Sequence, residues 1–261
     1  MIGQAIADGI LTGAIVALGA IGVTFTLGIM RFANFAHSEL LTWGGYIALV
    51  IVTFAGPGTP TGPLSFGWQL LAAALVMRHV VVLVWGHESR YYTRELQMAI
   101  ELVPGVRVLP DQIFIVALAL AAMLALHLFL TRSRTGMAMR AMAESPALAQ
   151  VCGIEVEAVV RLTWIISGAL AAFAGVFIGL TPQLHPEIGF NLLLSLFAAA
   201  ILGGVGSLTG AVVGGFLVGL AENLSLLVIS PGYKGAMPFL LLLLILIVRP
   251  QGLFGERSGR S

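Results

Sequence analysis

The sequence predicts an all-α protein that lies in a membrane as a polytopic bundle of about seven to eight spans. Of its 261 residues, 59% are hydrophobic and only 10% are charged, whereas soluble domains average about 45–50% apolar and about 25% charged residues. The mean hydropathy is +1.02. A water-soluble globule of this size could not bury so much apolar surface, so a soluble enzyme and a disordered protein are both excluded. The formal net charge of +1 leaves no footprint for nucleic acid.

Apolar stretches of about 18–20 residues, long enough to cross a bilayer, recur along the chain. The stretch 190–203 is shorter, which favours a tilted or partly re-entrant helix. We therefore expect spans at residues 5–30, 35–55, 64–85, 112–130, 163–181, 190–203, 208–229 and 234–249.

Arginine-rich polar segments indicate the orientation of the chain. The segment 131–162 opens with Arg132, Arg134 and Arg140 before any acidic residue appears, and the tail 249–261 holds three arginines against one acid. The positive-inside rule places both segments in the cytoplasm. Four spans lie between them, and an even number returns the chain to the same side.

The first three stretches give conflicting orientations. Counting each as one span places the N-terminus inside and Arg31 outside, whereas the absence of Lys or Arg before Arg31 predicts an N-terminus outside. Arg78 interrupts the third stretch. Either that stretch consists of two half-inserted pieces, or the orientation of the N-terminal part is frustrated.

Within the cytoplasmic segment, Ser145 and Pro146 are typical of an N-cap and a first helical residue, and Gly153 of a helix stop. The resulting helix of about two turns is too short to be stable alone in water, so it must lie on other structure. The preceding residues 135–143 offer an adaptable, methionine-rich face. This segment is either a loop packed on the ends of its own membrane spans or a docking element for a cytoplasmic partner.

Polar residues cluster where the second stretch begins, at Asn34, His37, Ser38 and Glu39. Polar groups at membrane depth are costly, so a broken helix that lines a substrate path is one interpretation. The other is a helix cap by Asn34 or Ser38, with Glu39 favouring the positive helix end. Glu222 allows the same choice between a pathway role and an interfacial position.

Gly206, Gly210 and Gly214 recur every four residues and place a flat strip on one helix face. Close packing of helices within the subunit explains such a strip. The alternative is a helix contact that moves during alternating access. The residues 37–45 and 206–215 echo each other weakly, as the two halves of an inverted repeat would.

The chain shows no energy source of its own. Its single lysine, Lys234, precedes Gly235, so no GxxxxGK[ST] phosphate loop exists. An ion-coupled carrier usually contains a relay of acids or histidines within its spans, and this chain offers few. An external energy source is therefore favoured, and a stand-alone ion-coupled carrier or channel for a small solute remains the alternative.

Four blocks of sequence carry a family resemblance: NFAHSELLTWGGY at 34–46, RTGMAMRAMAESPALAQVCGIEVEAVV at 134–160, FAAAILGGVGSLTGAVVGG at 197–215 and PGYKGAMPFLLLLLILIVRPQGLFG at 231–255. In this order they resemble the membrane permease of branched-chain amino acid importers powered by ATP-binding cassettes. The resemblance extends over about residues 5–255. Members of that family carry a longer stretch before the WG that matches Trp85–Gly86, by about one membrane crossing. This chain therefore lacks such a stretch, with the junction near Met77–Arg78.

The resemblance implies a single permease domain over 1–261, multi-pass in the cell inner membrane and in contact with lipid. It implies a second permease subunit, two cytoplasmic ATPase subunits and an extracytoplasmic solute-binding protein as partners. Branched-chain or related amino acids would be the substrate, and ATP would be used by the partners, so the chain itself needs no cofactor. It also implies that the segment 131–162 couples the ATPases to the membrane part, through Arg140, Ala141, Glu144, Ser145, Gly153 and Ile154.

An intramembrane hydrolase is the remaining class. Ser207 in GVGSLTG could suggest a nucleophile, but no histidine follows it in the chain. The five histidines lack metal-ligand spacing, and Cys152 is the only cysteine. We therefore expect neither catalytic nor metal-binding residues.

Overall fold

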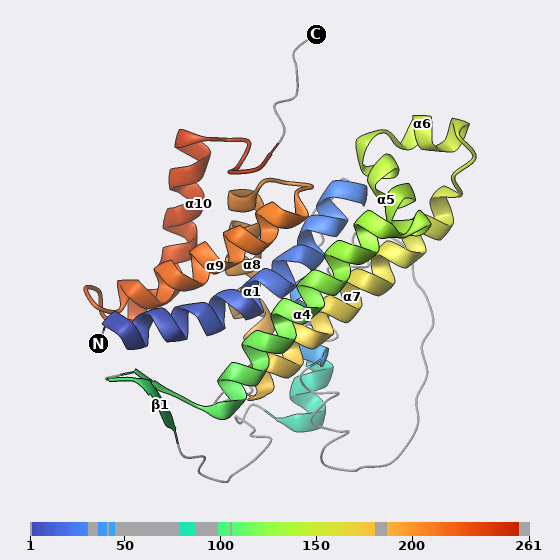
Figure 1. Cartoon of the computed structure of the whole chain (residues 1–261). Helices are drawn as coiled ribbons and strands as arrows, with labels where there is room; N and C mark the ends of the chain where they lie inside the picture. Colours follow the sequence, from blue (N-terminus) through green and yellow to red (C-terminus); the bar gives the residue numbers. More distant parts are fainter. Residues whose placement is uncertain are drawn as a thin grey trace.

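The computed structural model describes residues 2–30, 36–40, 42–44, 79–86, 99–104, 106–180 and 187–255 (Figure 1). The α-helices are α1 (Ile2–Met30), α4 (Pro110–Arg132), α5 (Arg134–Glu144), α6 (Pro146–Val151), α7 (Val156–Leu180), α8 (Ile188–Gly203), α9 (Leu208–Ser225) and α10 (Met237–Val248). A 3₁₀ helix, η1 (Pro231–Ala236), leads into α10, and two strands, β1 (Ile100–Val103) and β2 (Val106–Val108), precede α4.

Six of the eight predicted spans fall on helices, which confirms the all-α membrane class. Within the described residues, five helical segments are long and apolar enough to cross a membrane, and α8 is a shorter apolar helix. The predicted spans 35–55 and 64–85 lie mostly outside the described residues. There only the short helical stretches at 36–40 and 42–44, here called the His37 segment, and the helix at 79–85 are described.

Two helix boundaries differ from the prediction by more than three residues. The helix α7 begins at Val156 rather than at 163, because its first turns carry the exposed charged residues Glu157 and Arg161, whose side chains lie 3.8 Å apart. Hydropathy marks the part of a helix that lies in lipid and misses a polar extension into water. The helix α9 ends at Ser225, before the predicted end at 229.

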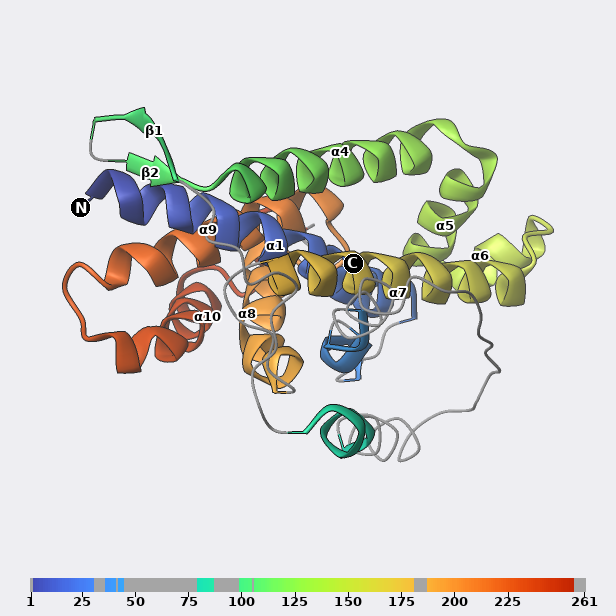
Figure 2. The same cartoon turned by 90° about the horizontal axis from the view of Figure 1, so that it is seen from below.

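The helix α1 occupies the centre of the bundle and contacts α9, α7, α8 and α4 (Figures 1 and 2). Its side chains are buried without a break from Gly13 to Thr26. A helix that is apolar all round is expected to be enclosed by other helices or by lipid, and here the other helices enclose it.

The glycine strip of α9 packs inside this subunit. Added Cβ atoms at Gly210 and Gly214, two members of the strip, would meet Gly203 and Ala199 of α8, and one at the neighbouring Gly215 would meet Ala17 of α1. The small residues therefore let α9 approach two helices at backbone distance, as close helix packing in membranes requires. This confirms the packing interpretation of the strip.

The contacts along α1 resolve the orientation conflict. At one end, the Arg107 backbone N–H donates to Gln4 Oε1 at 3.0 Å, which places the start of α1 beside the strands before α4. At the other end, Gly28 lies against Gly206, close to α5. The N-terminus and the coupling segment are therefore at opposite ends of the bundle (Figure 1). This placement agrees with the N-terminus outside that the absence of Lys or Arg before Arg31 predicts.

The polar segment 86–111 contains a feature that the sequence does not reveal. The strands β1 and β2 pair antiparallel, with Ile100 opposite Val108 and Glu101 opposite Arg107. Three- and four-residue strands are too short for a periodicity signal.

The C-terminal segment closes over the turn between α8 and α9. The backbone N–H groups of Leu253 and Phe254 donate to the carbonyl oxygens of Leu202 and Gly203 at 2.8 and 2.9 Å. These bonds satisfy carbonyls that the end of a helix leaves unpaired. At the start of α9, the Ser207 hydroxyl accepts from the Gly210 N–H at 3.0 Å, so Ser207 is a helix cap.

Candidate functional site

The His37 side chain is fully buried between α1 and α7. Its Nε2 lies 3.1 Å from the Gly19 carbonyl oxygen, and its Nδ1 lies 3.3 Å from Ser167 Oγ. Ser167 Oγ also donates to the Gly22 carbonyl at 2.9 Å. Gly22 is required here, because a Cβ would fall on the His37 ring.

These distances indicate which ring nitrogen of His37 carries a hydrogen. A carbonyl oxygen only accepts, so the hydrogen bond to Gly19 requires the hydrogen on Nε2. In the neutral ring Nδ1 is then an acceptor, and the single Ser167 hydroxyl hydrogen is shared between Nδ1 and the Gly22 carbonyl. His37 therefore joins three segments of the bundle through one polar cluster.

The rest of the His37 segment lies against the start of α8. Ser38, Glu39 and Thr42 are buried, and the Gly189 N–H donates to Thr42 Oγ1 at 2.8 Å. A Cβ at Gly189 would meet the Ser38 carbonyl, so the two segments touch at the backbone. The buried polar side chains face protein rather than lipid, as expected for polar groups at membrane depth.

A second polar cluster contains Glu222. Ser195 Oγ of α8 donates to Glu222 Oε1 at 2.7 Å, and both residues are buried. The neighbouring Asn223 donates to Thr12 Oγ1 of α1 at 3.1 Å and accepts from Lys234 Nζ at 3.2 Å. The cluster therefore connects α1, α8, α9 and η1.

The helix α8 links the two clusters, with Gly189 in one and Ser195 in the other. On α1, Thr12 and Gly19 are separated by two turns, or about 10 Å. The structure thus groups the predicted pathway residues His37, Ser38, Glu39 and Glu222 around α1 and α8 at different depths. Asn34 lies outside the described residues. A role in the substrate path stays a prediction for all five.

The sequence did not single out Ser167 and Ser195, the partners of His37 and Glu222. Each is a hydroxyl with apolar neighbours inside an apolar span, and such residues join membrane helices by hydrogen bonds. That signal is present in the sequence, but it does not reveal the partner. Among the described residues, no group of three or more His, Cys, Asp or Glu could hold a metal ion.

The predicted coupling segment forms two short helices. The helix α5 turns sharply from α4, and Gly136 allows this because a Cβ would meet the backbone of Leu130. Ser133 caps α5 by accepting from the Gly136 N–H at 2.9 Å. Met139 and Met142 are buried and form part of the hydrophobic core, whereas Met137 is exposed. The predicted methionine face therefore packs largely inside.

The predicted caps of α6 are confirmed. Ser145 Oγ accepts from the Leu148 N–H at 3.3 Å. At the other end, the N–H groups of Gly153 and Ile154 donate to Gln150 and Ala149 at 2.9 and 3.0 Å, and Gly153 has a φ of +81°. This is the Schellman arrangement, which favours glycine at its left-handed position.

The helix α6 presents apolar side chains outward. Val151 is 84% exposed and Leu148 is 63% exposed, whereas Ala149 is buried. The other predicted coupling residues share this end of the bundle, with Arg140 and Glu144 exposed and Ala141 half-buried.

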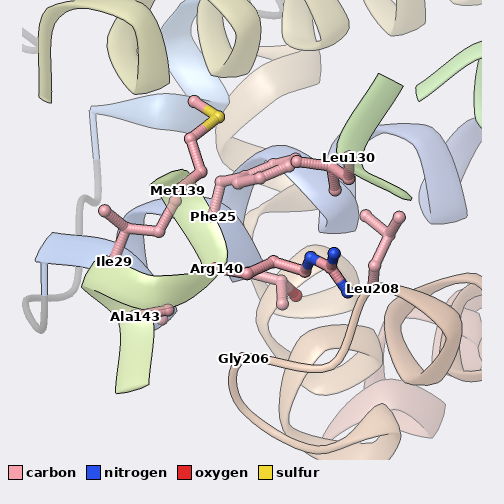
Figure 3. A pocket seen from close by; sticks show the side chains of 10 residues that line it. Phe25, Ile29, Leu130, Met139, Arg140, Ala143, Gly206 and Leu208 are labelled. Atoms are coloured by element: carbon pink, nitrogen blue, oxygen red, sulfur yellow. The ribbon is translucent and has the colours of Figure 1, made fainter. Parts of the chain in front are cut away.

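A cavity of about 160 Å³ lies beneath α5 (Figure 3). Its floor is the end of α1, and Leu130 of α4 and Leu208 of α9 line its sides. Arg140 extends from α5 toward Leu208. The rest of the lining is Thr24, Phe25, Gly28, Ile29, Met139, Ala143 and Gly206.

Comparison with known proteins gives a consistent picture. A family described as branched-chain amino acid transport system / permease component matches residues 5–93 and 80–246. The chain is 34% identical over 297 residues to the high-affinity branched-chain amino acid transport system permease protein LivH of Escherichia coli (strain K12), covering 97% of this chain and 95% of that protein. It is 32% identical over 298 residues to the corresponding permease protein BraD of Pseudomonas aeruginosa, with the same coverage.

The likeness extends to an archaeal protein. The probable branched-chain amino acid transport permease protein LivH of Methanocaldococcus jannaschii is 26% identical over 294 residues, covering 94% of this chain and 92% of that protein. No solved structure matches the chain. The 297 aligned positions with the Escherichia coli protein exceed the 261 residues of this chain, so that relative carries residues that this chain lacks. The two ranges matched by the family overlap at residues 80–93. This overlap lies close to the junction expected near Met77–Arg78.

Proposed function

The chain belongs to the family of permease components of branched-chain amino acid transport systems, and from this premise we propose how it works. It is a multi-pass membrane protein and a transport permease. We propose that it forms part of the translocation path for branched-chain or related small amino acids in the cell inner membrane, and that partner subunits supply the energy from ATP.

The observation that carries the ATP-driven mechanism is the outward apolar face of α6. Val151 and Leu148 are exposed on a six-residue helix that follows an arginine-rich segment. Apolar side chains held outward by two helix caps, on the side that the positive-inside rule assigns to the cytoplasm, suit a protein partner better than water. We propose that this partner is a pair of cytoplasmic ATPase subunits, one of which contacts α6.

The contacts of α5 support a route from α6 into the membrane. Met139 and Met142 of α5 are buried in the core, and α5 contacts the end of α1. A displacement of α6 would therefore move α5 against α1, the central helix. Alternating access would follow if the two ends of the bundle open in turn as the ATPases bind and release ATP.

The buried polar residues support the proposed path. A zwitterionic amino acid needs hydrogen-bonding and charged groups on its way through an apolar bundle. His37, Ser38, Glu39 and Glu222 are such groups, and they lie in the protein interior around α1 and α8. A second permease subunit would complete the path, and an extracytoplasmic binding protein would deliver the substrate.

Copurification and reconstitution test the proposal. Val151→Asp should abolish copurification of ATPase subunits and ATP-dependent uptake of leucine into proteoliposomes, because a charge replaces an apolar contact. Val151→Ile is the matched control and should retain both. The alternative, a stand-alone ion-coupled carrier or channel, would be established if the purified chain alone transported leucine without ATPase subunits.

A further inference from the structure

The cavity beneath α5 lies at the level where the membrane helices end. Phe25 and Ile29 belong to the last turns of α1, and Leu130 lies two residues before the end of α4. The polar segment with Arg132 and Arg134 follows directly. This change from apolar to basic residues marks the membrane surface, where lipid head groups lie.

The lining of the cavity combines one cation with an apolar recess. Phe25, Ile29, Leu130 and Leu208 supply the apolar part, and Arg140 is the only charged residue among the lining residues. Among the described residues, no carboxylate forms an ion pair with Arg140. A guanidinium above an apolar recess is complementary to a ligand with a negative head group and a hydrocarbon body.

We propose that this cavity binds an anionic phospholipid, with its phosphate on the Arg140 guanidinium and the first part of an acyl chain against Phe25, Ile29 and Leu130. Free phosphate would satisfy Arg140 but would leave the apolar lining uncovered. A lipid satisfies both parts, and it is present at this surface at high concentration.

The Arg140 site lies apart from the surface that α6 offers to a partner. Val151 and Leu148 are exposed on α6, whereas Arg140 lines the cavity between α5, α1, the end of α4 and the start of α9 (Figure 3). A lipid that fills this cavity would contact all four elements at once. It would therefore tie the motion of α5 to α1, α4 and α9, independently of which solute is transported.

Native mass spectrometry of the full-length chain with phosphatidylglycerol or phosphatidylcholine tests the proposal. The wild type should retain phosphatidylglycerol in preference to phosphatidylcholine. Arg140→Gln should bind phosphatidylglycerol about tenfold more weakly, the size expected for losing a charge-assisted hydrogen bond. Arg134→Gln is the matched control, because Arg134 is an exposed arginine of the same helix that does not line the cavity. It should bind as the wild type does.

A second variant tests the recess itself. Ala143→Phe should fill the cavity and release phosphatidylglycerol while Arg140 is unchanged. The proposal is overturned if the wild type shows no preference between the two lipids, or if Arg140→Gln and Arg134→Gln lose phosphatidylglycerol equally. It is also overturned if Ala143→Phe retains the lipid, or if millimolar inorganic phosphate displaces it completely, which would indicate a site for phosphate alone. Thermal unfolding of each variant verifies that it is folded.

Discussion

The Ser195 hydroxyl donates a 2.7 Å hydrogen bond to the Glu222 carboxylate and so joins α8 to α9 in the interior of the bundle. A hydrogen bond to a charged group contributes about 1.5–3 kcal/mol, and the loss of one partner leaves the other buried without it. The pair therefore connects the stability of the bundle to a residue of the proposed substrate path.

Mutation of Glu222 and mutation of Ser195 should have different effects on uptake and on stability. Glu222→Gln keeps a hydrogen-bond acceptor for Ser195 but removes the charge, so we expect an assembled complex with leucine uptake reduced at least about tenfold. Ser195→Ala should mainly lower the unfolding temperature, with uptake per folded complex close to normal. Uptake into proteoliposomes and thermal unfolding measure the two effects. Normal uptake by Glu222→Gln would exclude the carboxylate charge from the path.

The end of α6 offers a sharp test of coupling. In Gly153→Pro, the fixed φ of about −65° is incompatible with the +81° of Gly153, and the N–H that donates to Gln150 is lost. We expect ATP hydrolysis without substrate import. Gly153→Asn is the control, because asparagine tolerates the left-handed conformation, and it should import at a near-normal rate. If Gly153→Pro imports normally, α6 does not couple the two activities.

Packing of α9 on α1 should be intolerant of larger residues. In Gly215→Val, the new side chain would meet the backbone of Ala17. We expect the free energy of unfolding to fall by at least about 2 kcal/mol, and the yield of folded protein to fall with it. Gly232→Val is the control, because nothing lies within 4 Å of a Cβ at Gly232. The yield of folded chain after detergent extraction measures both. Equal yields would contradict the close approach of α9 to α1.

The orientation of α1 is open to chemical labelling. In a background with Cys152→Ser, a cysteine at Ile2 should react with a membrane-impermeant maleimide added from outside the cell. A cysteine at Leu148 should react only after the cytoplasmic side is made accessible. Both positions are exposed, so both thiols are reachable in the folded chain. Labelling of both positions from the same side would refute the opposite placement of the N-terminus and the coupling segment.

Much of the architecture follows from local rules. The caps at Ser145 and Gly153 require only neighbouring residues, and the apolar spans require only length and composition, so the sequence is sufficient to predict them. The arginines of the segment 131–162 indicate its side of the membrane for the same reason. The polar character of His37 and Glu222 is likewise visible in the chain, because polar side chains stand out among apolar neighbours.

The tertiary structure decided the relationships between distant segments. That His37 meets Ser167, that Glu222 meets Ser195 and that Arg140 lines a cavity with Leu208 depend on which helices pack together. The direction of α1 also required its contacts at both ends, since a helix with one apolar composition throughout fits a membrane in either direction. Hydropathy records the preference of each residue for lipid. It contains no information about the partner that a buried group finds, because that choice depends on packing between residues far apart in the chain.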